Sequence, residues 1–297
     1  MRTVLHPLLV TVLGIATASM LSAQPSPRPP GPLRFNVTNV SDSRTTNLST
    51  CTLDLNVFGD AADDAMSVLR VRITKAVDEL DRDLIMPQGN TTGFSFTEGG
   101  PRMQALRTQF RLRSPSRQSG TIKLIEGEID LFSPTSANGG KLTLPGFTSR
   151  ASEPIQHPTL KKLGIEAVYL TRESYEARVQ QMATAQKAGG GLEQLGPGLA
   201  DLFRGMLGNP LMGDARYTAY IYLKDSGNRV VGSDLVDGQG NLIRSRGRSS
   251  RGSMATGMIQ QINLDAPLPD DSQLNLYVSV PEAVRSLPLK LENVALP

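Results

Sequence analysis

The chain contains few of the residues that most often carry enzyme chemistry. Its 297 residues include one cysteine, two histidines and no tryptophan. A zinc site needs several cysteine or histidine ligands, and one of each cannot supply them. A serine triad needs a histidine base; His6 lies in an expected leader, and His157 stands in an expected loop. We therefore expect no enzyme, no catalytic residues, no metal site and no cofactor.

Aromatic residues are also scarce, at 5% of the chain, and the formal net charge is only +3. So few aromatic side chains argue against a large stacking platform for sugar rings or nucleic-acid bases. A weak net charge gives no support for a nucleic-acid partner, and none is expected.

Cys51 is the only cysteine, so the chain cannot form an intramolecular disulfide. It directly precedes the alternating apolar residues Leu53, Leu55 and Val57, which predict a half-buried strand. This position favours a buried, small apolar residue. The alternative is a thiol that forms a disulfide between two chains.

The first 23 residues have the composition of a secretory signal peptide. Arg2 supplies the positive charge, Leu8–Ala16 form a short apolar core, and cleavage is expected after Ala18 or Ala23. The apolar run is too short to cross about 30 Å of hydrocarbon as a membrane anchor. We therefore predict a secreted or periplasmic protein.

Apolar and polar residues alternate with period two through most of the remaining chain, which predicts a mainly β fold. Residues 24–50 are rich in Pro, Asn and Thr and are expected to form a linker. Residues 51–137 are predicted as a first β-sandwich domain and residues 138–297 as a second. The turn-rich segment Ser133–Gly140 marks the boundary between them.

The segment Thr121–Phe132 is expected to be a long, bent core strand. Ile122 falls on an even position and Ile129 on an odd one, so the buried face must change phase between them. One extra residue restores the alternation, which is what a β-bulge does. Because glycine tolerates the unusual dihedral angles of a bulge, we predict the bulge around Gly127.

A change of period marks a helical insertion in the second domain, at about residues 173–208. Within it, residues 192–207 carry leucine and methionine at three- and four-residue steps, which is typical of an amphipathic helix. Such a stripe most often covers an open end of a sheet. The alternative is that it attaches the protein to a membrane or a partner.

Three features recur together in this chain. They are an aspartate-led tight turn between alternating strands, the glycine-bulged strand, and the closing segment Leu287–Pro297. Together they resemble exported bacterial immunoglobulin-like proteins of unknown function. The resemblance implies two immunoglobulin-like β-sandwich domains, the second with the helical insertion, and a location in the cell envelope. It supplies no catalytic residues.

Five arginines form the candidate binding site. They alternate with apolar residues in two expected strands and are Arg70, Arg72, Arg107, Arg111 and Arg113. If the two strands pair in one sheet, the arginines share one outer face and make it cationic. In an exported protein, the ligand of such a face would be an acidic glycan or a membrane surface. The alternative is an ordinary solvated strand face.

Acidic residues support two other interpretations. Glu126, together with a second strand carboxylate, would form the acid–base pair of a glycan-active hydrolase. The segments Asp78–Asp83 and Asp237–Asn241 carry oxygen ligands that partly match calcium loops. Ordinary turns also explain both segments, and Leu242 stands where a calcium loop requires glycine.

These patterns favour an exported, non-enzymatic β-sandwich protein with a binding or structural role in the cell envelope, directed toward acidic glycans. Its partner would be an acidic glycan, an envelope component or another exported protein. The alternatives are the glycan-active hydrolase and an envelope-attached protein that uses the amphipathic helix at 192–207.

Overall fold

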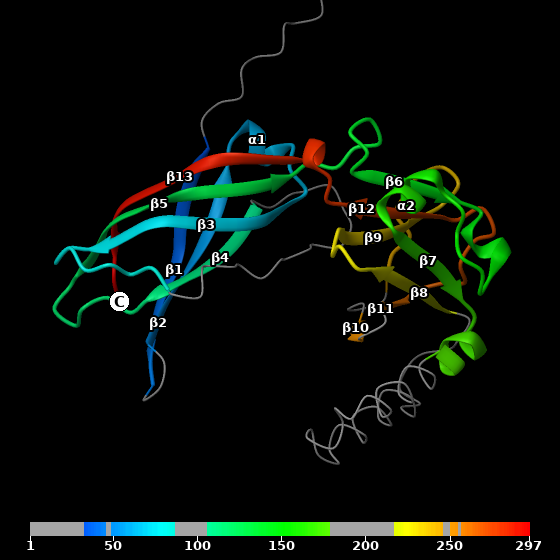
Figure 1. Cartoon of the computed structure of the whole chain (residues 1–297), viewed down its shortest axis with the longest axis horizontal. Helices are drawn as coiled ribbons and strands as arrows, with labels where there is room; N and C mark the ends of the chain where they lie inside the picture. The colour runs from blue at the N-terminus through cyan, green and yellow to red at the C-terminus, as the bar shows by residue number, and fades with distance from the viewer. Residues whose placement is uncertain (1–32, 46–48, 87–105, 179–216, 246–249, 255–256) are drawn as a thin grey trace, which may run out of the picture. The chain divides into compact units, whose positions relative to one another are not determined.

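The computed structural model describes residues 33–45, 49–86, 106–178, 217–245, 250–254 and 257–297. In these ranges the chain is mainly β, and all of the named strand pairs are antiparallel (Figure 1). The prediction of a mainly β fold is confirmed. The expected signal peptide lies outside the described residues.

Six strands form two three-stranded sheets, with the orders β1-β2-β4 and β13-β5-β3. Their bounds are β1 Arg34–Arg44, β2 Ser49–Phe58, β3 Ser67–Asp78, β4 Leu106–Arg113, β5 Thr121–Phe132 and β13 Val284–Ala295. A short helix, α1 (Asp60–Asp63), lies between β2 and β3.

The two sheets enclose one hydrophobic core, as the period-two alternation requires. In β2, Leu53 and Leu55 are at most 1% exposed, and Asp54 between them is partly exposed. The same buried cluster contains Phe110 of β4 and Ile125 of β5. β2 and β4 therefore each place an apolar face toward the core and a polar face outside, whereas Ile129–Phe132 of β5 are all buried.

Seven further strands form two more sheets, with the orders β10-β11-β8-β7 and β6-β12-β9. Their bounds are β6 Lys141–Pro145, β7 Ile165–Leu170, β8 Thr218–Asp225, β9 Val230–Val236, β10 Ser250–Met254, β11 Gly257–Asn263 and β12 Gln273–Val278. Three short helices accompany them: η1 (Phe147–Arg150), α2 (Pro158–Leu163) and η3 (Pro281–Ala283).

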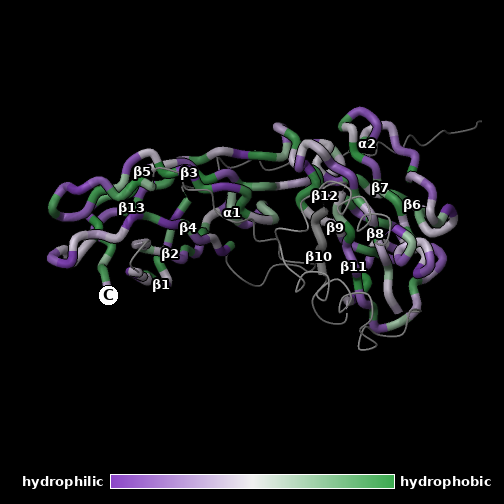
Figure 2. Tube along the Cα trace, turned by 60° about the horizontal axis from the view of Figure 1, so that its bottom comes forward, coloured by the Kyte–Doolittle hydropathy of each residue, from purple (hydrophilic) through white to green (hydrophobic). Residues whose placement is uncertain are grey.

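A second buried cluster, which includes Leu144, Ile221 and Leu276, fills the space between these sheets. Hydrophobic residues follow the strands, whereas the connecting turns are largely hydrophilic (Figure 2). This distribution is the one that the alternation predicts.

The predicted linker at 24–50 ends earlier than expected. Residues 34–44 form β1, which pairs with β2 along its length. Phe35, Val37 and Val40 are only partly exposed and pack against the first core. The asparagine, threonine and serine residues between them hide this alternation, because a polar composition resembles that of a linker.

The last strand, β13, does not belong to the second domain, where its residues were predicted to lie. β13 pairs with β5 from Val284 to Ala295, so the end of the chain returns to the first pair of sheets. Leu289, Leu291 and Val294 are buried in the first core. Period two identifies a strand, but it carries no information on which sheet the strand joins.

The β3–β5 pair is irregular at the predicted place, where the extra residue lies on the neighbouring strand, and again nearer the start of β5, where β5 itself has an extra residue. The register shifts after Ile73, which faces Gly127, so Thr74 of β3 is the extra residue. The extra residue of β5 is Lys123, because Val77 faces Leu124 and Asp78 faces Ile122. The buried face of β5 changes phase at this point, between Ile122 and Ile125. Gly127 is required for another reason: a Cβ there would lie 2.1 Å from the Arg72 carbonyl oxygen.

Only the first turns of the predicted helical insertion lie within the described residues, at 172–178. Tyr175 stacks on Tyr220 of β8 with ring centroids 4.2 Å apart, and the Arg178 guanidinium lies 4.1 Å from the centre of the Tyr222 ring. This start of the insertion therefore packs on the outer face of the β10-β11-β8-β7 sheet. The amphipathic segment 192–207 lies outside the described residues.

Candidate binding face

The structure places the five candidate arginines on two different sheets. Arg70 and Arg72 belong to β3, whereas Arg107, Arg111 and Arg113 belong to β4. Because β3 and β4 are not members of one sheet, the five side chains do not share one face. The expectation of a single cationic face made by all five is therefore wrong.

Arg70 and Arg72 are paired with carboxylates of the neighbouring strand β5. Arg70 Nη2 lies 2.6 Å from Asp130 Oδ2, and Arg72 Nη1 lies 2.5 Å from Glu128 Oε2. The β3–β5 register places each arginine directly opposite its carboxylate. Their charges are balanced within the sheet, which leaves them poorly suited to bind an anion.

The three arginines of β4 form a row that we name the Arg ladder: Arg107, Arg111 and Arg113. All three are exposed and alternate with buried apolar residues of the same strand. Side chains two residues apart on a strand are about 7 Å apart. No ion pair joins the ladder to a carboxylate in the ranges that the structure covers.

Short polar side chains stand beside the ladder on the same face. In the β2–β4 register, Arg107 faces Asn56, Arg111 faces Thr52 and Arg113 faces Thr50. These neighbours are shorter than an arginine, so the guanidinium groups can extend beyond the surrounding surface.

A hydrogen-bonded row, which we name the amide bridge, crosses this face between Arg107 and Arg111. It consists of Asn39, Asp54 and Gln109 from three adjacent strands. Gln109 Nε2 donates to Asp54 Oδ1 at 2.8 Å, and Asn39 Nδ2 donates to Asp54 Oδ2 at 3.0 Å. No pattern in the sequence reveals this row, because its members become neighbours only through the strand register.

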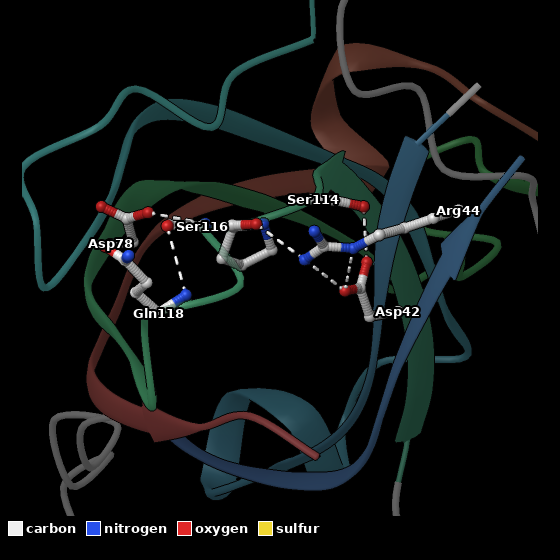
Figure 3. Close-up of polar contacts among 7 residues, drawn as sticks. Asp42, Arg44, Asp78, Ser114, Ser116 and Gln118 are labelled. Atoms are coloured by element: carbon white, nitrogen blue, oxygen red, sulfur yellow. Dashed lines mark hydrogen bonds and ion pairs between the residues drawn. The ribbon is translucent and has the colours of Figure 1, made fainter. Parts of the chain in front are cut away.

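A second polar network holds the end of the ladder against β1 (Figure 3). Arg44 Nη2 donates to the Pro115 carbonyl at 2.8 Å, and its Nε donates to Asp42 Oδ2 at 2.7 Å. Ser114 Oγ donates to Asp42 Oδ1 at 2.5 Å. Burial alone would raise the pKa of the Asp42 carboxyl, but its bonds with Ser114 and Arg44 hold the pKa below its ordinary value.

Asp78 holds the other side of the β4–β5 loop and is fully buried. Its Oδ1 accepts from the backbone N–H groups of Leu80 and Arg82 at 3.1 and 2.9 Å. Its Oδ2 accepts from the backbone N–H of Ser116 at 3.0 Å (Figure 3). Burial raises the pKa of this carboxyl, but the hydrogen bonds outweigh burial and lower the pKa. These bonds explain Asp78 as a turn residue rather than a calcium ligand.

The other predicted calcium segment is also an ordinary turn. Asp237 Oδ1 accepts from the backbone N–H groups of Gln239 and Asn241 at 2.9 and 2.8 Å. Hydrogen bonds from Asn241 lower the pKa of the Asp237 carboxyl. Within the described ranges, no group of three or more His, Cys, Asp or Glu side chains is arranged to hold a metal ion.

Glu126, the carboxylate of the hydrolase interpretation, stands in register between two cations, Lys75 and Lys290. Two hollows of about 590 Å³ each open on the described surface. One lies between β1 and the end of β13, and the other includes Arg70 and Asp130. Glu126 lines neither hollow.

His157 ends the loop before α2 and is the N-cap of that helix. Its Nδ1 accepts the backbone N–H of Thr159 at 3.2 Å, and Pro158 follows at the first helical position. Both features are typical of a helix start. The side chain therefore has a structural role.

Cys51 is expected to resist thiol reagents while the protein is folded. It is 0% exposed, and burial raises the pKa of its thiol to about 11, so almost no reactive thiolate is present at neutral pH. Labelling with a maleimide should be slow in native buffer and complete in denaturant. Rapid native labelling, or a disulfide-linked dimer on a non-reducing gel, would contradict the buried placement.

Comparison with known proteins yields no family model, curated protein or solved structure that matches the chain. No helix in the described parts of the chain has the length and hydrophobicity needed to cross a membrane.

Proposed function

We propose that the protein is an exported, non-enzymatic binding protein of the cell envelope, and that the Arg ladder binds an acidic glycan. The observation that carries this proposal is the row of three exposed guanidinium groups with no carboxylate partner among the described residues. Cations that form no ion pair with an internal carboxylate attract anionic ligands and can form charge-assisted hydrogen bonds with them.

The linear arrangement of the ladder favours a chain-like ligand. Arg107, Arg111 and Arg113 lie along one strand, over a span of about 20 Å. A polymer with repeated acidic groups can contact all three at once, and each contact raises the effective concentration for the next. The weak net charge of +3 gives no support for a nucleic acid as this polymer.

The proposal also includes the architecture and the export route. Two buried clusters, one in each pair of antiparallel sheets, support two immunoglobulin-like sandwich domains. The composition of the first 23 residues supports secretion or a periplasmic location.

Reversing the ladder with Arg107→Glu, Arg111→Glu and Arg113→Glu together is expected to weaken binding to an acidic polysaccharide about 100-fold. Each exposed contact contributes up to about 1 kcal/mol, and the new carboxylates add repulsion. Retention on immobilised polygalacturonate, measured at increasing salt, tests this. Wild-type retention should fall as salt rises, because salt screens exposed charges.

A matched control makes the same change of charge elsewhere. Lys161, Lys162 and Lys224 are exposed and lie in α2 and β8, away from the ladder strand. Their triple replacement by glutamate should leave retention within about threefold of wild type. Equal losses in both triple variants, or no loss in the ladder variant, would eliminate the ladder as the binding site.

A further inference from the structure

The amide bridge adds hydrogen-bond acceptors to a face that otherwise offers cations. Asn39, Asp54 and Gln109 form one row across β1, β2 and β4. Gln109 is two residues from Arg107 and two from Arg111, and side chains at this spacing point to the same face of a strand. The bridge therefore lies within the binding face proposed above.

The Asp54 carboxylate determines which way the two amides point. An ionised carboxylate only accepts hydrogen bonds, so Asn39 and Gln109 must each turn their NH₂ group toward it. The 3.0 and 2.8 Å contacts match this orientation. The two amide oxygens then point away from Asp54, and no donor in the described residues contacts them.

These oxygens cannot interact favourably with an anion, because phosphate, sulfate and carboxylate oxygens also only accept. They can accept a hydrogen bond from a hydroxyl group. A ligand that satisfies the whole face must therefore carry acidic groups for the Arg ladder and hydroxyl groups for the amide bridge. A polyanion without hydroxyl groups satisfies only the ladder.

We infer that the amide bridge makes the face selective for a hydroxylated polyanion, an acidic polysaccharide, over a polyanion that lacks hydroxyl groups. This inference rests on the proposed function, since it concerns the same face. Asn39 and Gln109 are the specificity-determining residues, and Asp54 is the positioning residue that orients them. The ladder supplies affinity for both classes of polyanion.

The test compares two probes, polygalacturonate and inorganic polyphosphate, against the full chain. Gln109→Val replaces the amide with a side chain that suits a strand and leaves the ladder intact. We expect its affinity for polygalacturonate to fall at least fivefold relative to its affinity for polyphosphate. Asn39→Val should shift the ratio in the same direction, and Gln156→Val, at an exposed position in another part of the chain, should leave it unchanged. Circular dichroism checks that each variant is folded.

The outcomes separate the inference from the proposed function. If the wild type prefers polygalacturonate and Gln109→Val loses that preference, the inference is supported. If the ratio of affinities does not change in Gln109→Val and Asn39→Val, the inference is overturned while the ladder remains the binding site. If the wild type binds neither probe, or binds both regardless of the ladder, the proposed function fails and the inference fails with it.

Discussion

Replacing Gly127 with alanine is expected to destabilise the protein by about 3 kcal/mol, at the upper end of overpacking effects. The new Cβ would lie 2.1 Å from the Arg72 carbonyl oxygen and 3.0 Å from the Ile73 Cα. Both are backbone atoms of the adjacent strand β3, so a side-chain rotation cannot relieve the collision. Urea unfolding followed by circular dichroism measures the change in the free energy of unfolding.

The matched control for this prediction is Gly120→Ala. A Cβ at Gly120 would approach only the Glu79 carboxylate oxygens, at 4.0 Å, which is an ordinary contact. Its free energy of unfolding should stay within about 0.5 kcal/mol of the wild type. If Gly127→Ala is as mild as this control, the close approach of β3 to β5 is contradicted.

Replacing Asp78 with alanine is expected to lower the free energy of unfolding by about 3 kcal/mol. The change removes a fully buried carboxylate and leaves the backbone N–H groups of Leu80, Arg82 and Ser116 without their acceptor. The β3 turn and the β4–β5 loop both lose their anchor. Urea unfolding at pH 7 measures the loss.

The matched control is Glu292→Ala, which removes an exposed carboxylate. It should lower the free energy of unfolding by less than about 1 kcal/mol.

The contribution of the Asp78 carboxylate to the free energy of unfolding should decrease as the pH falls. Its pKa is lower in the folded protein than the ordinary value of 3.8. The unfolded chain therefore takes up the proton first as the pH falls, and the stabilisation is present above about pH 4 and lost below it. The difference between the wild type and Asp78→Ala should narrow from pH 5 to pH 2. A constant difference would show that the charged form is not what the loop requires.

Alternation predicts the interior of strands well because each residue's face depends only on its neighbours in the chain. Leu53, Leu55 and Phe110 are buried where period two places them, and Arg107, Arg111 and Arg113 are exposed. Alternation alone did not identify β1 as a strand. Its apolar residues Phe35 and Val37 stand among so many polar residues that the segment has the composition of a linker, and a linker was predicted there.

Which strands pair with each other cannot be predicted from the alternation of apolar and polar residues. The division of the five arginines depends on β3 pairing with β5 and β4 pairing with β2. That pairing gives Arg70 a carboxylate partner and leaves the Arg ladder without one among the residues described. It also brings Asn39, Asp54 and Gln109 into one row from positions that are far apart in the sequence.

By itself, the order of residues determined that this protein is mainly β and which side of most strands is buried. The tertiary structure alone decided which strands are neighbours and therefore which charges are balanced and which remain exposed. The physical reason is the distance along the chain between the residues that interact. The face of a side chain follows from local backbone geometry, whereas pairing depends on the packing of the whole core.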